Sequence, residues 1–260
     1  MSVLKSLCLA FSMYSRIPVP RVTWEEKNMK YVLCFFPWVG LVIGGGIYLL
    51  WVLRSQIGIF VPFSVFVLTG TVLPILLTGG IHLDGFMDTM DALHSYRDRE
   101  RKLEILKDPH IGAFACISLV CETALYGAAL FFLLEERQIL FLGIGFFVSR
   151  TLSAFGLLTL QNAKGDGLAF TFVCGASRRI VLAVLSLWLF LAALAAYFLY
   201  GGYGIGCIAV SLLVYFYYEV MAYRQFGGLT GDLAGWFLQV CELLILAAVV
   251  LTERVCALWC

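Results

Sequence analysis

The amino-acid sequence predicts an all-α protein, a polytopic helical bundle that lies within a membrane. Two observations carry this prediction. Hydrophobic residues make up 62% of the chain and charged residues only 13%, whereas soluble domains have roughly 45–50% apolar and about 25% charged residues. The apolar residues also form long runs, and a helix needs about 20 of them to cross a bilayer. These are too few charged residues to cover a surface exposed to water, which argues against a soluble globular enzyme.

Seven apolar runs are long enough to be membrane-spanning helices. Their limits are Tyr31–Leu53, Val61–Ile81, Gly112–Leu134, Ile139–Leu160, Ile180–Tyr200, Gly204–Tyr223 and Gly235–Leu251. The second run contains two prolines and ends at Gly79-Gly80, so we expect it to bend near its end. The seventh is short, which suggests a tilted or re-entrant helix. Because no repeat or low-complexity linker separates the runs, residues 1–260 are predicted to form a single membrane domain.

The basic residues are unevenly placed about these runs. Fourteen of the 18 Lys and Arg residues fall on the side of the N-terminal segment 1–30, three fall on the other side, and Arg150 lies inside a run. Cytoplasmic loops carry the excess of Lys and Arg. We therefore expect a multi-pass protein of the cell (inner) membrane, surrounded by lipid, with a cytoplasmic N-terminus. We expect the N-terminal segment to lie at the membrane interface. The net charge of +1 argues against a nucleic-acid partner.

The densest polar stretch is residues 82–111, on the predicted cytoplasmic side. Asp84, Asp88 and Asp91 are spaced i, i+4 and i+7, which places them on one face of a helix within an arc of about 60°. Like charges repel, so a cation is expected among them, and carboxylate oxygens favour Mg²⁺. A solvated acidic loop is the alternative. The intervening residues are mainly apolar, however, so we expect the opposite face to be buried.

Further polar residues on the same side are candidates for substrate contacts. Lys107 and His110 stand beside a Pro and a Gly at the start of the third run, where a basic group is able to hold a phosphate, and Asp108 is a candidate metal ligand. His82 is a candidate polar contact. The remaining charges of this stretch are typical of a solvated helix.

A glycine-rich turn, GGLTGD, precedes the seventh run at residues 227–232. Glycines let backbone N–H groups approach an anion, so Thr230 and Gly231 are candidate phosphate contacts. Asp232 is placed to reach the first acidic cluster or a substrate hydroxyl. A plain interhelical turn is an equally good interpretation of this pattern by itself.

Four ionisable residues, Glu122, Arg150, Glu219 and Glu242, fall within the apolar runs. A charged side chain inside the membrane is energetically costly, so each of these residues should face the bundle interior or a cavity. Two interpretations stay open: Arg150 pairs with one of the glutamates, or it lines a substrate cavity and contacts a phosphate. The residues together indicate a Mg²⁺-type carboxylate site for a phosphate or pyrophosphate compound, at which an alcohol attacks in line.

Residues 79–93, GGIHLDGFMDTMDAL, resemble the signature of the cobalamin synthase (adenosylcobinamide-GDP ribazoletransferase) family. Similar blocks occur in order at residues 15–20, 99–112, 149–153 and 227–232. The resemblance implies a Mg²⁺-dependent membrane enzyme in which a hydroxyl of α-ribazole, free or as its 5′-phosphate, attacks adenosylcobinamide-GDP and releases GMP. It also implies metal and catalytic roles for Asp84, Asp88 and Asp91.

The resemblance further covers Lys107, Asp108, Arg150 and Asp232, where we expect the metal, phosphate and catalytic roles given above. CDP-alcohol phosphotransferases are the nearest alternative class of enzyme, but the residues that follow Asp84-Gly85 depart from their Asp-Gly-x-x-Ala-Arg motif. A transporter is the alternative outside enzymes, although the chain has no inverted repeat. A homo-oligomer is compatible with the sequence.

Overall fold

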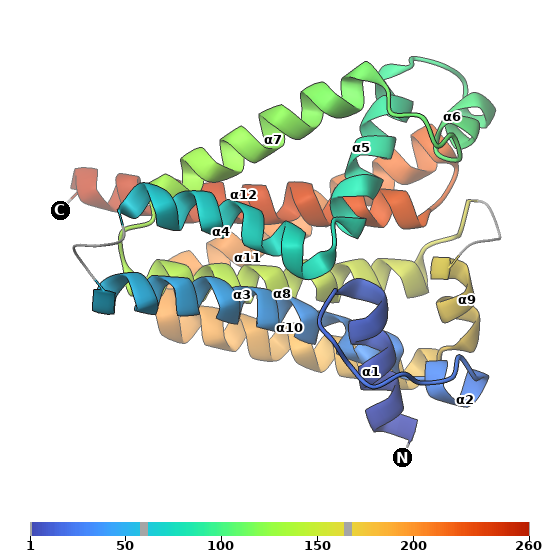
Figure 1. Ribbon diagram of the computed structural model, residues 1–260, viewed down its shortest axis with the longest axis horizontal. Helices are drawn as coiled ribbons and strands as arrows, with labels where there is room; N and C mark the ends of the chain where they lie inside the picture. The colour runs from blue at the N-terminus through green and yellow to red at the C-terminus, as the bar shows by residue number, and fades with distance from the viewer. Residues whose placement is uncertain (1, 58–61, 164–167, 260) are drawn as a thin grey trace.

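The computed structural model describes residues 2–57, 62–163 and 168–259, and its regular structure there is helical apart from one isolated β-bridge. The predicted all-α class is therefore confirmed (Figure 1). The helices are α1 (Ser2–Tyr14), α2 (Glu26–Met29), α3 (Val32–Ile57), α4 (Phe63–Thr78), α5 (Ile81–His94), α6 (Arg99–Ile105), α7 (Ala113–Phe131), α8 (Glu136–Thr159), α9 (Leu168–Gly175), α10 (Arg178–Tyr200), α11 (Gly202–Met221), the π-helix η2 (Ala222–Phe226) and α12 (Gly231–Trp259).

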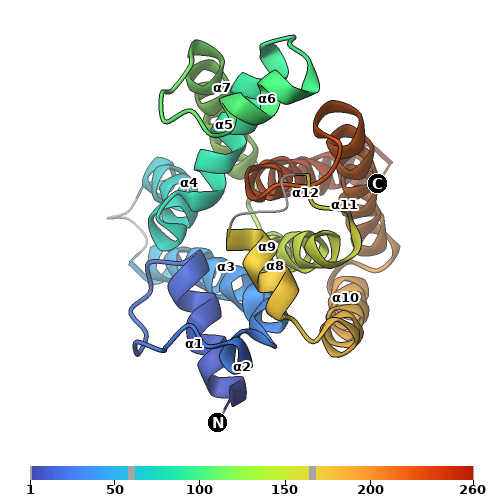
Figure 2. The same ribbon diagram turned by 90° about the vertical axis from the view of Figure 1, so that its right-hand side faces the viewer.

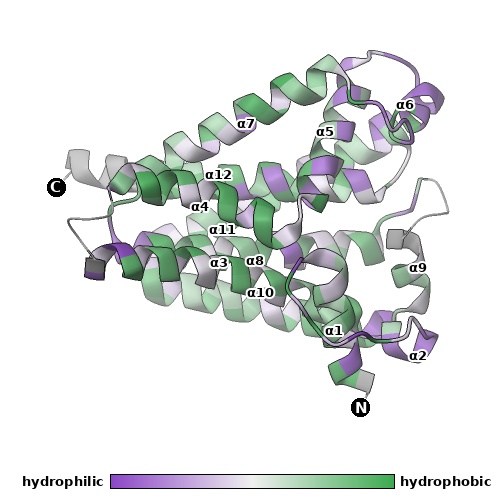
Figure 3. Cartoon of the chain, in the orientation of Figure 1, coloured by the Kyte–Doolittle hydropathy of each residue, from purple (hydrophilic) through white to green (hydrophobic). Residues whose placement is uncertain are grey.

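The long helices lie side by side along one axis, and the two ends of the chain lie at opposite ends of the bundle (Figure 1). Six of the described helices are long and apolar enough to cross a membrane by themselves: α3, α7, α8, α10, α11 and α12. Hydropathy follows this division, because the long helices are mostly apolar while α2, α6 and much of α5 are polar (Figure 3). The predicted polytopic bundle is confirmed.

The second predicted span is a bent pair of helices. Helices α4 and α5 meet at an angle of 94°, and Gly79 and Gly80 between them have φ of 67° and 81°. These left-handed conformations suit glycine because it has no Cβ. The predicted bend is confirmed. It is sharper than a kink within one helix and turns α5 across the end of the bundle.

The seventh span differs from its prediction. Helix α12 is continuous from Gly231, and its apolar part extends over Gly231–Thr252, so the alternative of a short, re-entrant helix is wrong, while a tilted helix stays a prediction. The helix starts four residues before the apolar run. Its first turn is capped by the Thr230 hydroxyl, which accepts a hydrogen bond from the backbone N–H of Leu233 at 3.2 Å. Hydropathy overlooks this polar first turn.

Small residues allow two close helix crossings that matter for the site. A Cβ added to Gly44 of α3 would lie 2.4 Å from the Cα of Gly143 on α8. One added to Gly85 of α5 would lie 2.8 Å from the carbonyl oxygen of Asp232 on α12. Helices pack backbone to backbone at such positions. The second crossing determines where the polar ends of α5 and α12 meet.

Two of the three basic residues that the sequence assigns to the second side, Arg54 and Arg137, share one end of the bundle. Arg54, in the last turn of α3, and Arg137, in the first turn of α8, lie at the end away from α6. Seen from the other end (Figure 2), α1 lies against α3, α2 lies against α1 and α9, and α9 lies across α8. Lys164 lies outside the described residues. The cytoplasmic location of the end that carries α1, α2, α6 and α9 stays a prediction.

Candidate functional site

A cavity of about 450 Å³ opens at the end of the bundle where α5 turns away. Its walls come from α1, α3, α5, α8 and α12, with residues that follow α6 and α8. The cavity brings together six of the residues predicted from the sequence: His82, Asp84, Lys107, Thr230, Gly231 and Asp232. These residues come from three separate parts of the chain.

The two carboxylates at the cavity are placed by the crossing of α5 and α12. Asp84 lies in the first turn of α5 and is exposed, while Asp232 lies in the first turn of α12 and is half-buried. Gly85 and Gly235 allow the two helices to approach, since a side chain at either position would collide with the other backbone. The Thr230 hydroxyl also donates to Asp232 Oδ2 at 3.4 Å.

The cavity changes character with depth. Asp84, Lys107 and Gly231 are exposed and mark its mouth. Tyr14 and Phe36 are buried, and their ring centroids are 4.1 Å apart. Burial raises the pKa of Tyr14, so its phenol is neutral. A polar mouth therefore leads to an aromatic and aliphatic interior.

The glycine-rich turn that precedes α12 is held on two sides. On one side, Arg99 Nε donates to the carbonyl oxygen of Phe226 at 2.7 Å, and Lys102 Nζ donates to Gln225 Oε1 at 2.5 Å. On the other side, the backbone of Leu229 exchanges hydrogen bonds of 2.8 Å with that of residues 161 and 163. The turn is thus fixed between α6 and the end of α8.

The role of α6 was missed by sequence reasoning, which assigned its charges to a solvated face. Lys102 is buried against Gln225, and Lys107, just after the helix, lines the cavity. Mixed charge at helical spacing gives no signal of such docking. The cavity residues Phe36, Ser153 and Leu157 were also missed, because each lies in an apolar run and only the packing of α3 against α8 turns it toward the site.

The second and third aspartates of α5 are not among the residues that line the cavity. Both oxygens of Asp91 accept backbone hydrogen bonds from the start of α7, from Gly112 N at 2.6 Å and from Ala115 N at 2.8 Å. Asp91 thus does for α7 what an N-cap side chain does. Asp88 is half-buried between Asp84 and Asp91 along the same face of α5.

Asp108 and His110 are exposed, bonded to each other and outside the set of cavity residues. Asp108 Oδ1 accepts from the backbone N–H of His110 at 3.0 Å and lies 2.6 Å from its ring Nδ1. The backbone N–H of His110, followed by its side chain, holds the pKa of Asp108 below the usual value. Asp108 is therefore a carboxylate at neutral pH.

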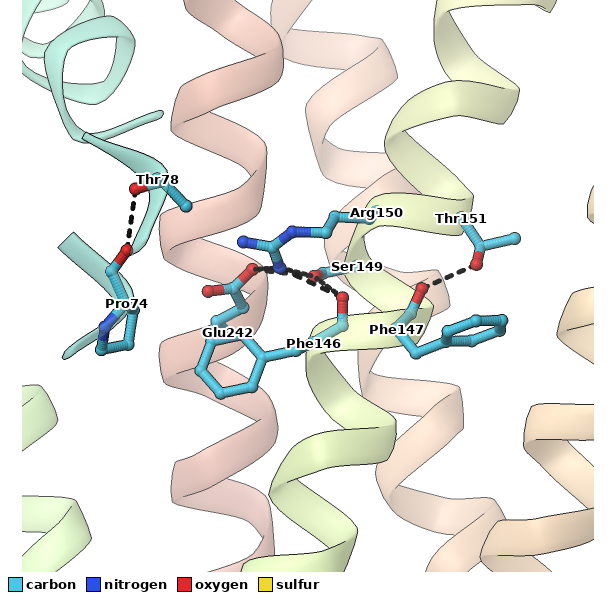
Figure 4. Close-up of polar contacts among 8 residues, drawn as sticks. All are labelled: Pro74, Thr78, Phe146, Phe147, Ser149, Arg150, Thr151 and Glu242. Atoms are coloured by element: carbon cyan, nitrogen blue, oxygen red, sulfur yellow. Dashed lines mark hydrogen bonds and ion pairs between the residues drawn. The ribbon is translucent and has the colours of Figure 1, made fainter. Parts of the chain in front are cut away.

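Arg150 pairs with Glu242 inside the bundle (Figure 4). Its Nη1 lies 2.6 Å from Glu242 Oε1, which also accepts from the Ser149 hydroxyl at 2.8 Å. Of the two interpretations of the intramembrane charges, the structure therefore contains the ion pair. A small pocket of about 30 Å³ beside the pair is lined also by Glu122 and by His82, which contributes to both pockets.

The carboxylates fit a Mg²⁺ ion that completes its shell with other ligands. Among the residues that the structure describes, no three His, Cys, Asp or Glu side chains are grouped so as to hold a metal by themselves. Mg²⁺ commonly takes one or two carboxylates together with water and substrate phosphates. Asp84 at the cavity mouth, with Asp88 next along the same face of α5, would offer such carboxylate oxygens.

The fold and this cavity define a class: a polytopic helical membrane protein with a polar, carboxylate-bearing site at one end of its bundle. Comparison with known proteins identifies the family. The sequence model of cobalamin-5-phosphate synthase matches residues 6–250, and the chain belongs to that family.

Three relatives illustrate the similarity, and each is named adenosylcobinamide-GDP ribazoletransferase. The protein of Lachnoclostridium phytofermentans is 42% identical over 98% of this chain and 97% of its own. The relative from Listeria monocytogenes (strain HCC23) is 33% identical over 95% of this chain and 98% of its own. The relative from Clostridium perfringens (strain SM101) is 32% identical over 92% and 94%. No solved structure matches the chain.

Proposed function

We propose that this protein is an adenosylcobinamide-GDP ribazoletransferase that joins adenosylcobinamide-GDP to α-ribazole or its 5′-phosphate. The observation that carries the proposal is the meeting of Asp84, Lys107 and Asp232 at the mouth of one cavity. The name shared by relatives that match nearly the whole chain supports it.

The reaction exchanges one phosphorus–oxygen bond for another. A hydroxyl oxygen of α-ribazole attacks the phosphorus on the cobinamide side of the diphosphate, and the bond to the oxygen of the departing GMP breaks. Asp232 accepts a hydrogen bond from the attacking hydroxyl and takes its proton as the new bond forms. The products are the cobamide, or its 5′-phosphate, and GMP.

The charges at the cavity mouth stabilise the diphosphate. Lys107 contacts the phosphate oxygens, and the first turn of α12, with Thr230 and Gly231, presents backbone N–H groups to them. Asp84 would hold a Mg²⁺ ion, with Asp88 next along the same face; this ion would neutralise the diphosphate and the leaving phosphate. Asp91 has no part in this proposal, because both of its oxygens cap α7.

A turnover assay tests the proposal. Purified protein with Mg²⁺, adenosylcobinamide-GDP and α-ribazole should release GMP and form a cobamide, and removal of Mg²⁺ with a chelator should stop both. Turnover of a CDP-alcohol without cobamide formation would contradict the proposal, and so would full activity in the presence of the chelator.

We also propose that the active site faces the cytoplasm at the cell membrane, since it lies at the basic end of the bundle.

A further inference from the structure

The cavity is large enough for only part of what the reaction brings together. Its volume of about 450 Å³ suits one small molecule, since sites for such ligands measure roughly 300–1,000 Å³. A corrin macrocycle with its side chains, nucleotide and diphosphate is far larger than a small-molecule ligand. The corrinoid substrate therefore stays largely outside, and only one portion of the reacting pair enters the interior.

The interior of the cavity suits a flat, mostly apolar group. Tyr14, Phe36 and His82 form a ring cluster, with centroids 4.1 Å apart for Tyr14–Phe36 and 5.7 Å apart for Phe36–His82. Leu157 and Leu238 are buried and add aliphatic surface. Aromatic faces and aliphatic side chains bind planar apolar rings by burial and stacking.

This interior also holds two polar atoms that need a partner. Ser153 Oγ and His82 Nε2 are buried and make no hydrogen bond to any residue in the described ranges. Both residues line the cavity, and a buried polar atom left without a partner is costly. Ser153 and Leu157 are one helical turn apart on α8, so the hydroxyl lies beside the apolar wall.

We infer that the deep end of this cavity is the subsite for the base of α-ribazole, an inference that rests on the proposed function. The base is a dimethylbenzimidazole, a planar bicycle with one free ring nitrogen. Its methylated ring fits against Leu157, Leu238 and the ring cluster, and its ring nitrogen accepts a hydrogen bond from Ser153. The ribose then points outward, which brings its hydroxyl to Asp84 and Asp232 at the mouth.

Guanine, the other base in the reaction, matches this interior poorly. Its edge carries several donors and acceptors, whereas the buried residues described at the deep end offer few polar groups, those of Tyr14, His82 and Ser153, among apolar side chains. Burying polar groups without partners costs binding free energy. The assignment makes Ser153 and Leu157 determinants of which lower base the enzyme accepts.

Steady-state kinetics with each substrate varied in turn test the inference. Leu157→Phe fills the apolar wall and should raise KM for α-ribazole by about tenfold or more, with KM for adenosylcobinamide-GDP unchanged. Ser153→Ala should raise KM for α-ribazole about fivefold. It should have no effect with an indole riboside, which lacks the free ring nitrogen.

Matched controls separate these effects from general damage. Ser211→Ala removes a buried hydroxyl that bonds within α11, and Leu213→Phe enlarges an exposed side chain of the same helix; both should leave the two KM values unchanged. Thermal unfolding in detergent shows whether each variant folds. If Leu157→Phe does not fold, Ser153→Ala still tests the inference.

The outcomes separate the inference from the proposed function. A rise in KM for adenosylcobinamide-GDP, with that for α-ribazole unchanged, would overturn the inference and assign the interior to guanine. Equal sensitivity of the two ribosides to Ser153→Ala would also overturn it. A wild-type protein that forms no cobamide would instead overturn the proposed function. Binding of α-ribazole alone, measured by titration calorimetry, would then still report whether Leu157→Phe closes the subsite.

Discussion

The three aspartates on one face of α5 have different surroundings. Asp84 lines the cavity, Asp88 is half-buried, and Asp91 caps the start of α7. Their spacing predicts one shared face and suggests one shared role. The structure instead separates a residue at the site from a residue that joins two helices, and substitution distinguishes the two.

Asp84→Ala should abolish turnover while leaving the protein folded. A carboxylate that contacts a metal ion or substrate contributes about 100-fold or more to the rate, whereas an exposed side chain at a cavity mouth contributes little to stability. Cobamide formation and thermal unfolding in detergent measure the two effects. A large loss of stability without loss of turnover per folded molecule would contradict the assignment of Asp84 to the site.

Asp91→Ala should give the opposite result. The change leaves the N–H groups of Gly112 and Ala115 without the acceptor that they have now, and loss of a helix cap costs about 0.5–2 kcal/mol. We expect a lower midpoint of thermal unfolding, with turnover largely retained in the folded fraction. Full stability combined with loss of turnover would instead favour the metal role that the sequence pattern suggests for Asp91.

The ion pair between Arg150 and Glu242 predicts an asymmetry between single and double substitutions. Glu242→Leu leaves a buried guanidinium without its carboxylate, and breaking a buried pair in this way costs about 3–5 kcal/mol. Replacing both residues, as Arg150→Met with Glu242→Leu, removes the isolated charge and should recover much of the stability. Chemical unfolding in mixed micelles measures the difference. A double variant no more stable than Glu242→Leu would contradict this account.

At the scale of elements, the turn between η2 and α12 depends on glycine for two reasons. Gly227 has φ of 75°, and an added Cβ would overlap the guanidinium of Arg99. Gly201 has φ of 61° with nothing near the added atom, and Gly206 has neither restriction. Alanine substitutions at these three positions therefore compare a site with an unusual backbone conformation and a steric collision, a site with an unusual conformation alone, and a site with neither.

Substitution of each glycine by alanine should follow that order. Gly227→Ala should lower the unfolding midpoint most and also reduce turnover, because the turn positions Thr230 and Asp232. Gly201→Ala should cost about 1–3 kcal/mol, because φ of 61° with ψ of −140° is a conformation that residues with a Cβ rarely adopt, with turnover unchanged. Gly206→Ala should be neutral or slightly stabilising. A Gly227→Ala variant as stable as Gly206→Ala would show that neither the backbone conformation of Gly227 nor its contact with Arg99 limits stability.

The same elements show what the sequence is able to predict. The bend at Gly79-Gly80 follows from local chemistry, since two adjacent glycines favour backbone conformations that interrupt a helix. The start of α12 does not, because hydropathy treats Asp232 as outside the membrane although the helix begins before it. The interior of the cavity is beyond local patterns altogether. Phe36 and Ser153 line the same cavity because α3 packs against α8, with Gly40 and Gly44 at the crossing.

At the scale of the whole molecule, the bundle puts the ends of the chain on opposite sides, and the basic residues suggest which side is cytoplasmic. The cavity, α6 and the N-terminal segment share the end rich in Lys and Arg, while Arg54 and Arg137 lie at the other end. Membrane insertion retains basic segments in the cytoplasm. We therefore expect full-length protein fused at its C-terminus to alkaline phosphatase to be active in bacterial cells, since that enzyme works only outside the cytoplasm. A C-terminal green fluorescent protein fusion should be dark, and an N-terminal one should fluoresce. The reverse pattern would place the cavity on the outer face and would contradict the proposed cytoplasmic site.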